Sequence, residues 1–205
     1  MTYYLDLLGC AIFAISAILA ATQKELDVLG IIVVAFLSAV GGGTIRDTII
    51  GARPVFWVND PVYLGVIILT AILTILLANR THRMPAILLP LADAAGLALF
   101  TVLGAQKALA YGTPAITAVV MGVITGVAGG IIRDILASRV PMVLQKEIYA
   151  TASVLGGVVY TTALLFNATE GLAMMLGMAV VFILRMASVY WHFSLPTFKL
   201  KRDEL

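Results

Sequence analysis

The chain has 205 residues, of which 61% are hydrophobic and only 12% are charged, and its mean hydropathy is +1.06. Soluble domains are about half apolar and a quarter charged, so this composition excludes a water-soluble protein. A formal charge of +2 excludes a polybasic surface for a nucleic-acid partner, and one cysteine with two histidines cannot form a disulfide framework or a zinc cluster, so we expect no metal and no cofactor.

Seven stretches are long and apolar enough to cross a membrane. A bilayer core of about 30 Å requires about 20 apolar residues per helix. In chain order the predicted spans are 4–21, 28–50, 61–78, 85–106, 114–136, 148–166 and 171–190. The connections are too short for a folded extramembrane domain. We therefore expect an all-α integral membrane protein whose function lies within the helical bundle.

The basic residues near the span ends orient the bundle, because lysine and arginine remain preferentially in the cytoplasm. Two of them, Arg53 and Lys107, would lie on one side of the membrane. Eight would lie on the other side: Lys24, Arg80, Arg83, Arg139, Lys146, Lys199, Lys201 and Arg202. The imbalance predicts an N-terminus on the outer side of the membrane, in the periplasm or an organelle lumen, and a C-terminus in the cytosol.

The first spans recur later in the chain. Residues 42–47, Gly-Gly-Thr-Ile-Arg-Asp, return as residues 129–134, Gly-Gly-Ile-Ile-Arg-Asp, at an offset of 87. The same offset relates Asp6 to Asp93 and Phe13 to Phe100. Each copy holds three spans. Because three is an odd number, the second copy begins on the opposite side of the membrane and is inverted relative to the first. We predict two inverted three-helix repeats, residues 1–84 and 85–168, followed by a seventh helix and a cytosolic tail over 169–205.

Six charged residues of the repeats lie within the predicted spans. A charge in a bilayer costs several kcal/mol and needs a partner, which favours a function as pore or gate. Neighbours in a helix point about 100° apart, so we expect pairing between helices, of Asp6 with Arg46 and of Asp93 with Arg133. The alternative is that these charges only fix the helix register. The six are Asp6, Arg46, Asp47, Asp93, Arg133 and Asp134.

Glycines precede each Arg-Asp pair: Gly41, Gly42 and Gly43 in the first copy, and Gly129 and Gly130 in the second. Consecutive glycines weaken a helix, so we predict a kink or local unwinding at both places. Broken helices in inverted repeats commonly mark a substrate or ion site. Close helix packing is the other use of glycine, and we expect it as well in the fifth span, where glycines recur every four residues.

The remaining polar residues of the spans have simpler interpretations. Arg185, late in the seventh span, is predicted to extend its charge to the cytosolic surface, with a place in the charge network as the alternative. Tyr63 and Tyr149 lie near span ends, where aromatic rings anchor helices at the interface, and we expect no chemistry from them. The hydroxyl of Tyr160, in mid-span, faces either a polar pathway or a neighbouring carbonyl.

The three-plus-three-plus-one arrangement, with the sequence of 41–47 and its shortened echo at 129–134, resembles the prokaryotic branch of the trimeric intracellular cation (TRIC) channel family. The resemblance covers essentially the whole chain. It implies a homotrimer in the plasma (inner) membrane of a bacterium or archaeon, surrounded by membrane lipid. Each protomer would have its own pore through kinked second and fifth helices and would conduct monovalent cations, chiefly potassium but also sodium. Ala128 stands where the first copy has Gly41, so the second kink would be milder.

A secondary transporter for a small amino acid such as glycine is the alternative function. Inverted repeats with broken helices are typical of such transporters, in which the N-termini of half-helices bind a substrate carboxylate. An enzyme is not expected, because the sequence has no histidine pair, no serine or cysteine with a base, and no HExxH motif.

Overall fold

The computed structural model describes residues 2–22, 24, 26–80, 85–145, 148–191 and 193. Over these residues the chain forms seven α-helices and one short 3-10 turn, and no strand. The elements are α1 (Thr2–Ala21), α2 (Val28–Ile50), α3 (Val62–Arg80), α4 (Leu88–Ala110), α5 (Ala115–Leu136), η1 (Met142–Leu144), α6 (Ala150–Leu165) and α7 (Glu170–Trp191). This confirms the predicted all-α fold of seven helices.

The helices begin and end close to the predicted span limits. Asp27 caps α2, because its side chain accepts a hydrogen bond from the backbone N–H of Gly30 at 2.7 Å. Gly51 ends the same helix with a positive φ of 73°, which glycine adopts without strain. The largest difference is in α4, which begins at Leu88 and ends at Ala110, because the helix continues through Lys107 beyond the predicted span.

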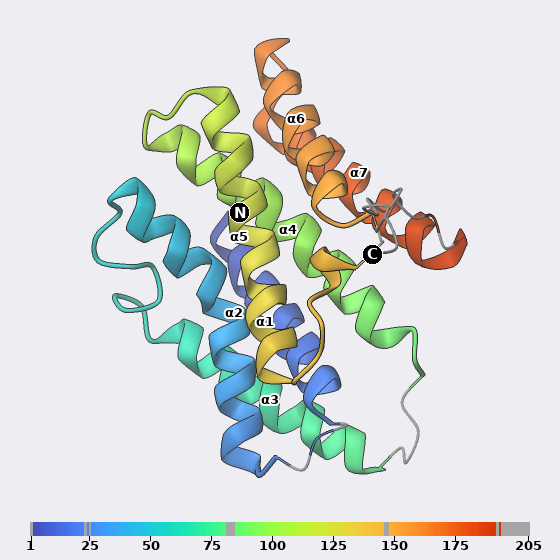
Figure 1. Cartoon of the computed structure of the whole chain (residues 1–205). Coiled ribbons are helices and arrows are strands. Elements are labelled where there is room, and N and C mark those ends of the chain that lie inside the picture. Colours follow the sequence, from blue (N-terminus) through green and yellow to red (C-terminus); the bar gives the residue numbers. More distant parts are fainter. Residues whose placement is uncertain are drawn as a thin grey trace, which may run out of the picture.

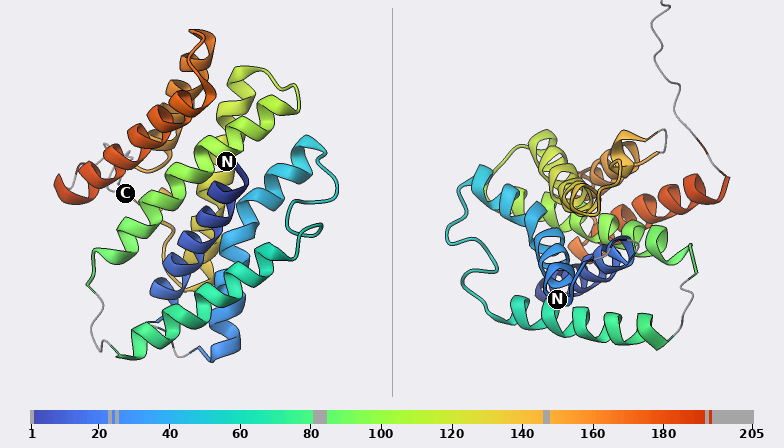
Figure 2. Two further views of the ribbon diagram at one scale, coloured as in Figure 1. Left: turned by 180° about the vertical axis from the view of Figure 1, so that it is seen from behind. Right: turned by 60° about the horizontal axis from the view of Figure 1, so that its bottom comes forward.

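Five of the described helices, α1, α2, α4, α5 and α7, are long and apolar enough to cross a membrane. The apolar parts of α3 and α6 are shorter. Two inverted repeats, α1–α3 and α4–α6, are arranged so that equivalent helices meet: α1 packs against α4, and α2 packs against α5 (Figure 1). The additional helix α7 lies along α4 and α6, on the side of the bundle away from α3 (Figure 2).

The centre of the bundle is a contact between equivalent residues of the two repeats. The rings of Phe13 and Phe100 stack, with centroids 5.2 Å apart and planes inclined by 10°. Each ring lies over a glycine of the opposite helix, since a Cβ atom on Gly9 would be 3.1 Å from Phe100 and one on Gly96 would be 3.3 Å from Phe13. Equivalent residues can meet in this way only where the axis that relates the repeats passes between them.

The helices α2 and α5 cross at two equivalent glycines, Gly42 and Gly129. A Cβ atom on Gly42 would overlap the carbonyl oxygen of Thr125, and one on Gly129 would lie 2.6 Å from the carbonyl oxygen of Ser38. Both helices remain continuous α-helix through the glycines, without the predicted local unwinding. The ribbon of α2 changes direction partway along its length (Figure 1), and the assignment of a kink to the glycines stays a prediction.

Candidate functional site: two buried charge clusters

The first charge cluster consists of Asp6, Arg46, Asp47 and Lys107. Arg46 is 2% exposed and Asp47 is fully buried. The Nε and Nη2 atoms of Arg46 each lie 2.8 Å from Oδ1 of Asp47. The Nζ atom of Lys107 lies 2.8 Å from the other oxygen, Oδ2, which also accepts a hydrogen bond from the backbone N–H of Phe56 at 3.1 Å. Asp47 is therefore fully compensated by two cations and one amide.

The expectation that Arg46 would pair with Asp6 rather than with its neighbour Asp47 is wrong. The guanidinium lies far from the helix axis on a long side chain, so it reaches sideways to Asp47 despite the angular separation of adjacent residues. Asp6 instead accepts a hydrogen bond from the hydroxyl of Tyr63 at 2.7 Å. Among the described residues no ion pair joins Asp6 to Arg46, although both line one cavity.

The second charge cluster consists of Asp93, Arg133, Asp134 and Arg185. Arg133 is fully buried; its Nη1 atom lies 2.6 Å from Oδ1 of Asp93, and its Nε atom lies 2.8 Å from Oδ1 of Asp134. Nη1 also donates to the hydroxyl of Ser16 on α1, at 2.7 Å. The predicted pairing of Asp93 with Arg133 is confirmed, whereas the arginine also binds the aspartate beside it, as Arg46 does.

Arg185 belongs to this cluster, and the prediction that its charge extends to the membrane surface is wrong. Its side chain is fully buried, because α7 packs against α4 and directs it inward. Its Nη2 atom lies 3.5 Å from Oδ2 of Asp93, and Nη1 donates to the carbonyl oxygen of Ile148 at 3.2 Å. The guanidinium lies over the ring of Tyr149, 4.5 Å from the centroid, in a cation–π contact.

In each cluster a tyrosine hydroxyl donates a hydrogen bond to an aspartate. The hydroxyl of Tyr149 donates to Oδ1 of Asp93 at 3.0 Å, just as Tyr63 donates to Asp6. Both tyrosines are buried, so the expectation that they only anchor helix ends is wrong. Tyr63 and Tyr149 recur in the sequence at an offset of 86, one less than that of the charged motif. That recurrence is the signal that identifies them.

The loop that follows each Arg-Asp pair covers its cluster. The backbone N–H of Met142 donates to Oδ2 of Asp134 at 2.9 Å, the role that Phe56 has in the first cluster. The ring of Phe56 lies 5.7 Å from both cations of the first cluster, Arg46 and Lys107. In the second cluster, the sulfur of Met142 lies 3.6 Å from Nη2 of Arg133 and 3.9 Å from Nη2 of Arg185. A polarisable side chain therefore lies against two cations in each half.

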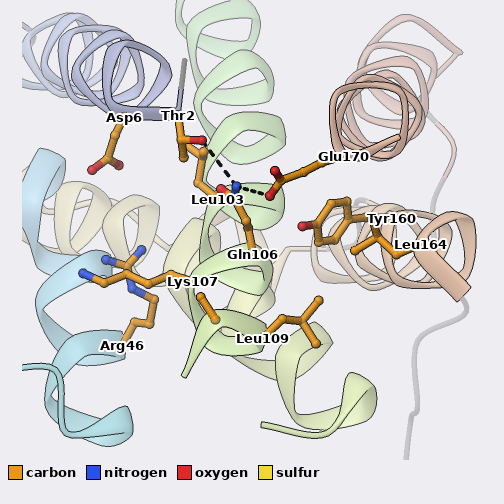
Figure 3. Close-up of a pocket in the computed structure, with 11 residues that line it drawn as sticks. Thr2, Asp6, Arg46, Leu103, Gln106, Lys107, Leu109, Tyr160, Leu164 and Glu170 are labelled. Carbon is orange, nitrogen blue, oxygen red and sulfur yellow. Dashed lines mark hydrogen bonds between the residues drawn. The ribbon is translucent and has the colours of Figure 1, made fainter. Parts of the chain in front are cut away.

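A cavity of about 590 Å³ opens beside the first cluster (Figure 3). It lies between the beginning of α1, the ends of α2, α4 and α6, and the beginning of α7. Tyr160 lines this cavity. Of the two interpretations offered for this residue, its position agrees with the one in which it faces a polar pathway. Its lining residues are Thr2, Asp6, Arg46, Leu103, Gln106, Lys107, Leu109, Ala110, Tyr160, Leu164 and Glu170.

A second cavity, of about 640 Å³, reaches the other cluster only at its edge. It is lined by Asp134, Arg139, Val140, Met142 and Gln145. Asp93 and Arg133 do not line it and are fully buried. Within the described part of the chain, no group of three or more histidine, cysteine, aspartate or glutamate side chains is arranged to hold a metal ion. The arrangement is thus two compensated charge clusters, each next to a cavity.

Comparisons with known proteins place these features in a family. A sequence model of the family described as "Glycine transporter" matches residues 3–79 and again residues 90–165, so its two matches begin 87 positions apart. The chain is 48% identical over 204 residues to the UPF0126 inner membrane protein YadS of Escherichia coli, covering 99% of each chain. It is 46% identical to a UPF0126 membrane protein of Vibrio cholerae, covering 98% of this chain and 84% of the relative.

Solved structures with the same fold include the TRIC trimeric intracellular cation channel orthologue from Rhodobacter sphaeroides, with a TM-score of 0.89 and 39% identity over 94% of this chain and 98% of that one. A prokaryotic TRIC channel in 0.5 M KCl has a TM-score of 0.86 and 30% identity over 95% and 98% of the two chains. A TRIC channel from C. elegans with bound Ca²⁺, at 14% identity and a TM-score of 0.62, shares the fold alone.

Proposed function

Because the chain belongs to the prokaryotic TRIC channel family, we propose that it is a channel through which cations cross a bacterial inner membrane. One observation carries this proposal: the likeness to TRIC channel structures extends over 94–98% of the chain at TM-scores of 0.86–0.89. Relatives at 46–48% identity that are named as membrane or inner membrane proteins support the location. The family description as a glycine transporter is a label. A carrier for a small amino acid is therefore the alternative that the experiment must distinguish from a channel.

The pathway that we propose runs through a single protomer, between α1, α2, α4 and α5, from the first cavity to the second. Asp6 and Asp47 would attract cations at one end, and Asp93 and Asp134 at the other. Charged rings and single basic residues in a pore tune both selectivity and gating. Arg46 and Arg133, each hydrogen-bonded to these carboxylates, would set the height of the barrier to cations.

The second cluster would be the closed gate of this pathway. Asp93, Arg133 and Arg185 are fully buried, whereas the cavity beside the first cluster reaches Asp6 and Arg46. Conduction would require Arg133 to leave Asp93 or Asp134, because their compensated charges occupy the space between the second cavity and the centre of the bundle. The movement would involve α5 and α7, which carry the two arginines of the cluster.

The assembly and orientation follow as further parts of the proposal. The chain would form a homotrimer with one pore in each protomer, and potassium would be the main permeant ion, with sodium also conducted. The excess of basic residues at one set of span ends supports an N-terminus outside and a C-terminus in the cytosol, with the first cavity facing outward. The repeats 1–84 and 85–168 would form the pore, and 169–205 would contribute Arg185 to its gate.

Single-channel recording of the purified protein in a planar bilayer tests this function. In a potassium chloride gradient without amino acids, we expect discrete current steps that reverse towards the potassium potential. Asp47→Asn should change the unitary conductance at least about twofold, because it leaves the positive charges of Arg46 and Lys107 unbalanced at the mouth of the pathway. The matched control Asp27→Asn, at the exposed cap of α2, should leave it unchanged. A silent bilayer together with saturable glycine uptake into liposomes would contradict the channel and favour a carrier.

A further inference from the structure

The first cavity presents hydrogen-bond donors that the protein does not use. Arg46 binds Asp47 through Nε and Nη2, and its Nη1 atom makes no hydrogen bond within the described part of the chain. Lys107 uses one of the three hydrogens of its ammonium group on Asp47. Both residues line the cavity. Two cationic groups therefore have donors left for a molecule inside it.

The same cavity presents acceptors that are only half used. The hydroxyl of Tyr63 binds Oδ2 of Asp6, which leaves Oδ1 without a hydrogen bond from any described residue. Gln106 donates to Oε1 of Glu170 at 2.6 Å, and Oε2 likewise has no donor among the described residues. An ionised carboxylate accepts at both oxygens. The cavity thus offers anionic acceptors as well as cationic donors.

The two basic residues and Glu170 stand on opposite sides of the cavity, with Asp6 on the side of the basic residues (Figure 3). Arg46 and Lys107 extend from α2 and α4 on one side, and Glu170 extends from the beginning of α7 on the other (Figure 3). The side chains of Leu103 and Leu164 supply apolar wall, and the ring of Tyr160 lies beside Glu170. A volume of about 590 Å³ is within the range of small-molecule sites and leaves room for an apolar substituent.

We propose that the first cavity binds a small zwitterion with an apolar substituent, its anionic group towards Arg46 and Lys107 and its ammonium group towards Glu170. A simple anion would be repelled by Asp6 and Glu170, and a simple cation by the two basic residues, whereas a zwitterion pairs with both sides. A free α-amino acid and the phosphoethanolamine headgroup of a lipid share this chemistry.

An occupant of this cavity lies in the proposed cation pathway. It would cover Asp6 and Arg46 at the mouth and lower the cation current. This consequence rests on the proposed channel function, but binding itself does not. If the protein binds the zwitterion but carries no current, the channel is refuted and the binding site is supported. If the protein conducts cations but binds no zwitterion, the binding site is refuted and the channel is supported.

Isothermal titration calorimetry on the purified full chain in detergent tests the site with three probes that share the isobutyl side chain of leucine. Leucine carries both charges, 4-methylpentanoate lacks the ammonium group, and 3-methylbutylamine lacks the carboxylate. We expect saturable binding of leucine and at least about tenfold weaker binding of the other two, because each loses one set of charge-assisted hydrogen bonds. Equal binding of leucine and either single-charge probe would overturn the proposal, as would no saturable binding of leucine.

Two substitutions test the two sides of the site separately. Glu170→Gln and Lys107→Met should each weaken leucine binding by about tenfold, since each removes one charged partner. Gln145→Leu, an exposed polar residue of the second cavity, is the matched control and should leave the affinity unchanged. Glu170 is exposed at the first turn of α7, so Glu170→Gln keeps the test decisive if Lys107→Met does not fold. Unchanged leucine affinity in Glu170→Gln would refute the site.

Nanodiscs distinguish the two sources of the zwitterion. Leucine binding that persists in both phosphatidylglycerol and phosphatidylethanolamine nanodiscs supports a soluble amino acid. Leucine binding in phosphatidylglycerol that is lost in phosphatidylethanolamine supports the lipid headgroup, because the headgroup would then occupy the cavity. Absence of leucine binding in phosphatidylglycerol nanodiscs, where no zwitterionic lipid competes, would overturn the site.

Discussion

The first and second charge clusters are built from the same duplicated motif but differ in their access to solvent. Asp47 and Asp134 each bind the preceding arginine and a loop amide. The side chain of Lys107 in the first cluster is 29% exposed, whereas that of Arg185 in the second is fully buried. The difference arises from α7, which packs against α4 and has no counterpart in the first repeat. The repeated motif thus accounts for the contacts that the two clusters share, and the additional helix α7 makes the second cluster inaccessible to solvent.

This difference predicts unequal costs when the central arginine of each cluster is removed. Arg133→Ala should lower the free energy of unfolding by about 3–5 kcal/mol, because both buried carboxylates would lose their shortest ion pair and the contact that Asp93 keeps with Arg185 is 3.5 Å long. Arg46→Ala should cost about 1–3 kcal/mol, because Asp47 keeps Lys107 and the Phe56 amide. Unfolding in detergent followed by circular dichroism measures both. An equal cost at both sites would show that burial by α7 has no energetic effect.

Alanine substitution of the glycine at the crossing of α2 and α5 should have the same effect in both repeats. Gly42→Ala and Gly129→Ala each place a Cβ atom against a backbone carbonyl that cannot turn aside, and we expect losses of about 1–3 kcal/mol or more from overpacking. The control is Gly65→Ala on α3, where the new methyl group meets open space and the change should stay within about 1 kcal/mol. Thermal unfolding of the purified variants gives the ranking. Tolerance at Gly42 with intolerance at Gly129 would contradict the equivalence of the repeats.

The smallest expected effects concern the two tyrosines. Tyr149→Phe removes a hydroxyl that donates to the fully buried Asp93, and we expect a loss of about 1–2 kcal/mol. Tyr63→Phe should cost about 0.5 kcal/mol, because Asp6 lies at a cavity where water can replace the lost donor. Chemical denaturation of both variants provides the comparison. A reversed order would indicate that the first cavity excludes water.

The sequence predicts most of the fold because a bilayer permits few alternatives. Runs of about 20 apolar residues must be helices. Seven such runs give the seven helices with shifts of at most four residues at either end, at α4. The offset of 87 between the glycine motifs identifies the two repeats, and the pairing of Asp93 with Arg133 follows from their shared end of the bundle.

The rest of the site depends on geometry that sequence spacing does not contain. A rule about angles between adjacent residues does not include the length and reach of an arginine, which is why the bonds from Arg46 to Asp47 and from Arg133 to Asp134 were not expected. The burial of Arg185 requires the position of α7 against α4, and an unrepeated helix has no symmetry partner from which to infer it. Candidate roles of these residues in a pore remain predictions.

The stacked rings of Phe13 and Phe100 have a consequence for how the two halves of the chain can change over evolutionary time. They form an isologous contact, the kind found at the twofold axis of a symmetric dimer, where one residue meets its own copy. In a symmetric dimer, one residue supplies both sides of such a contact, so a single mutation changes both at once. In this chain each ring has its own codon, so a mutation changes one ring alone and the other must accommodate it.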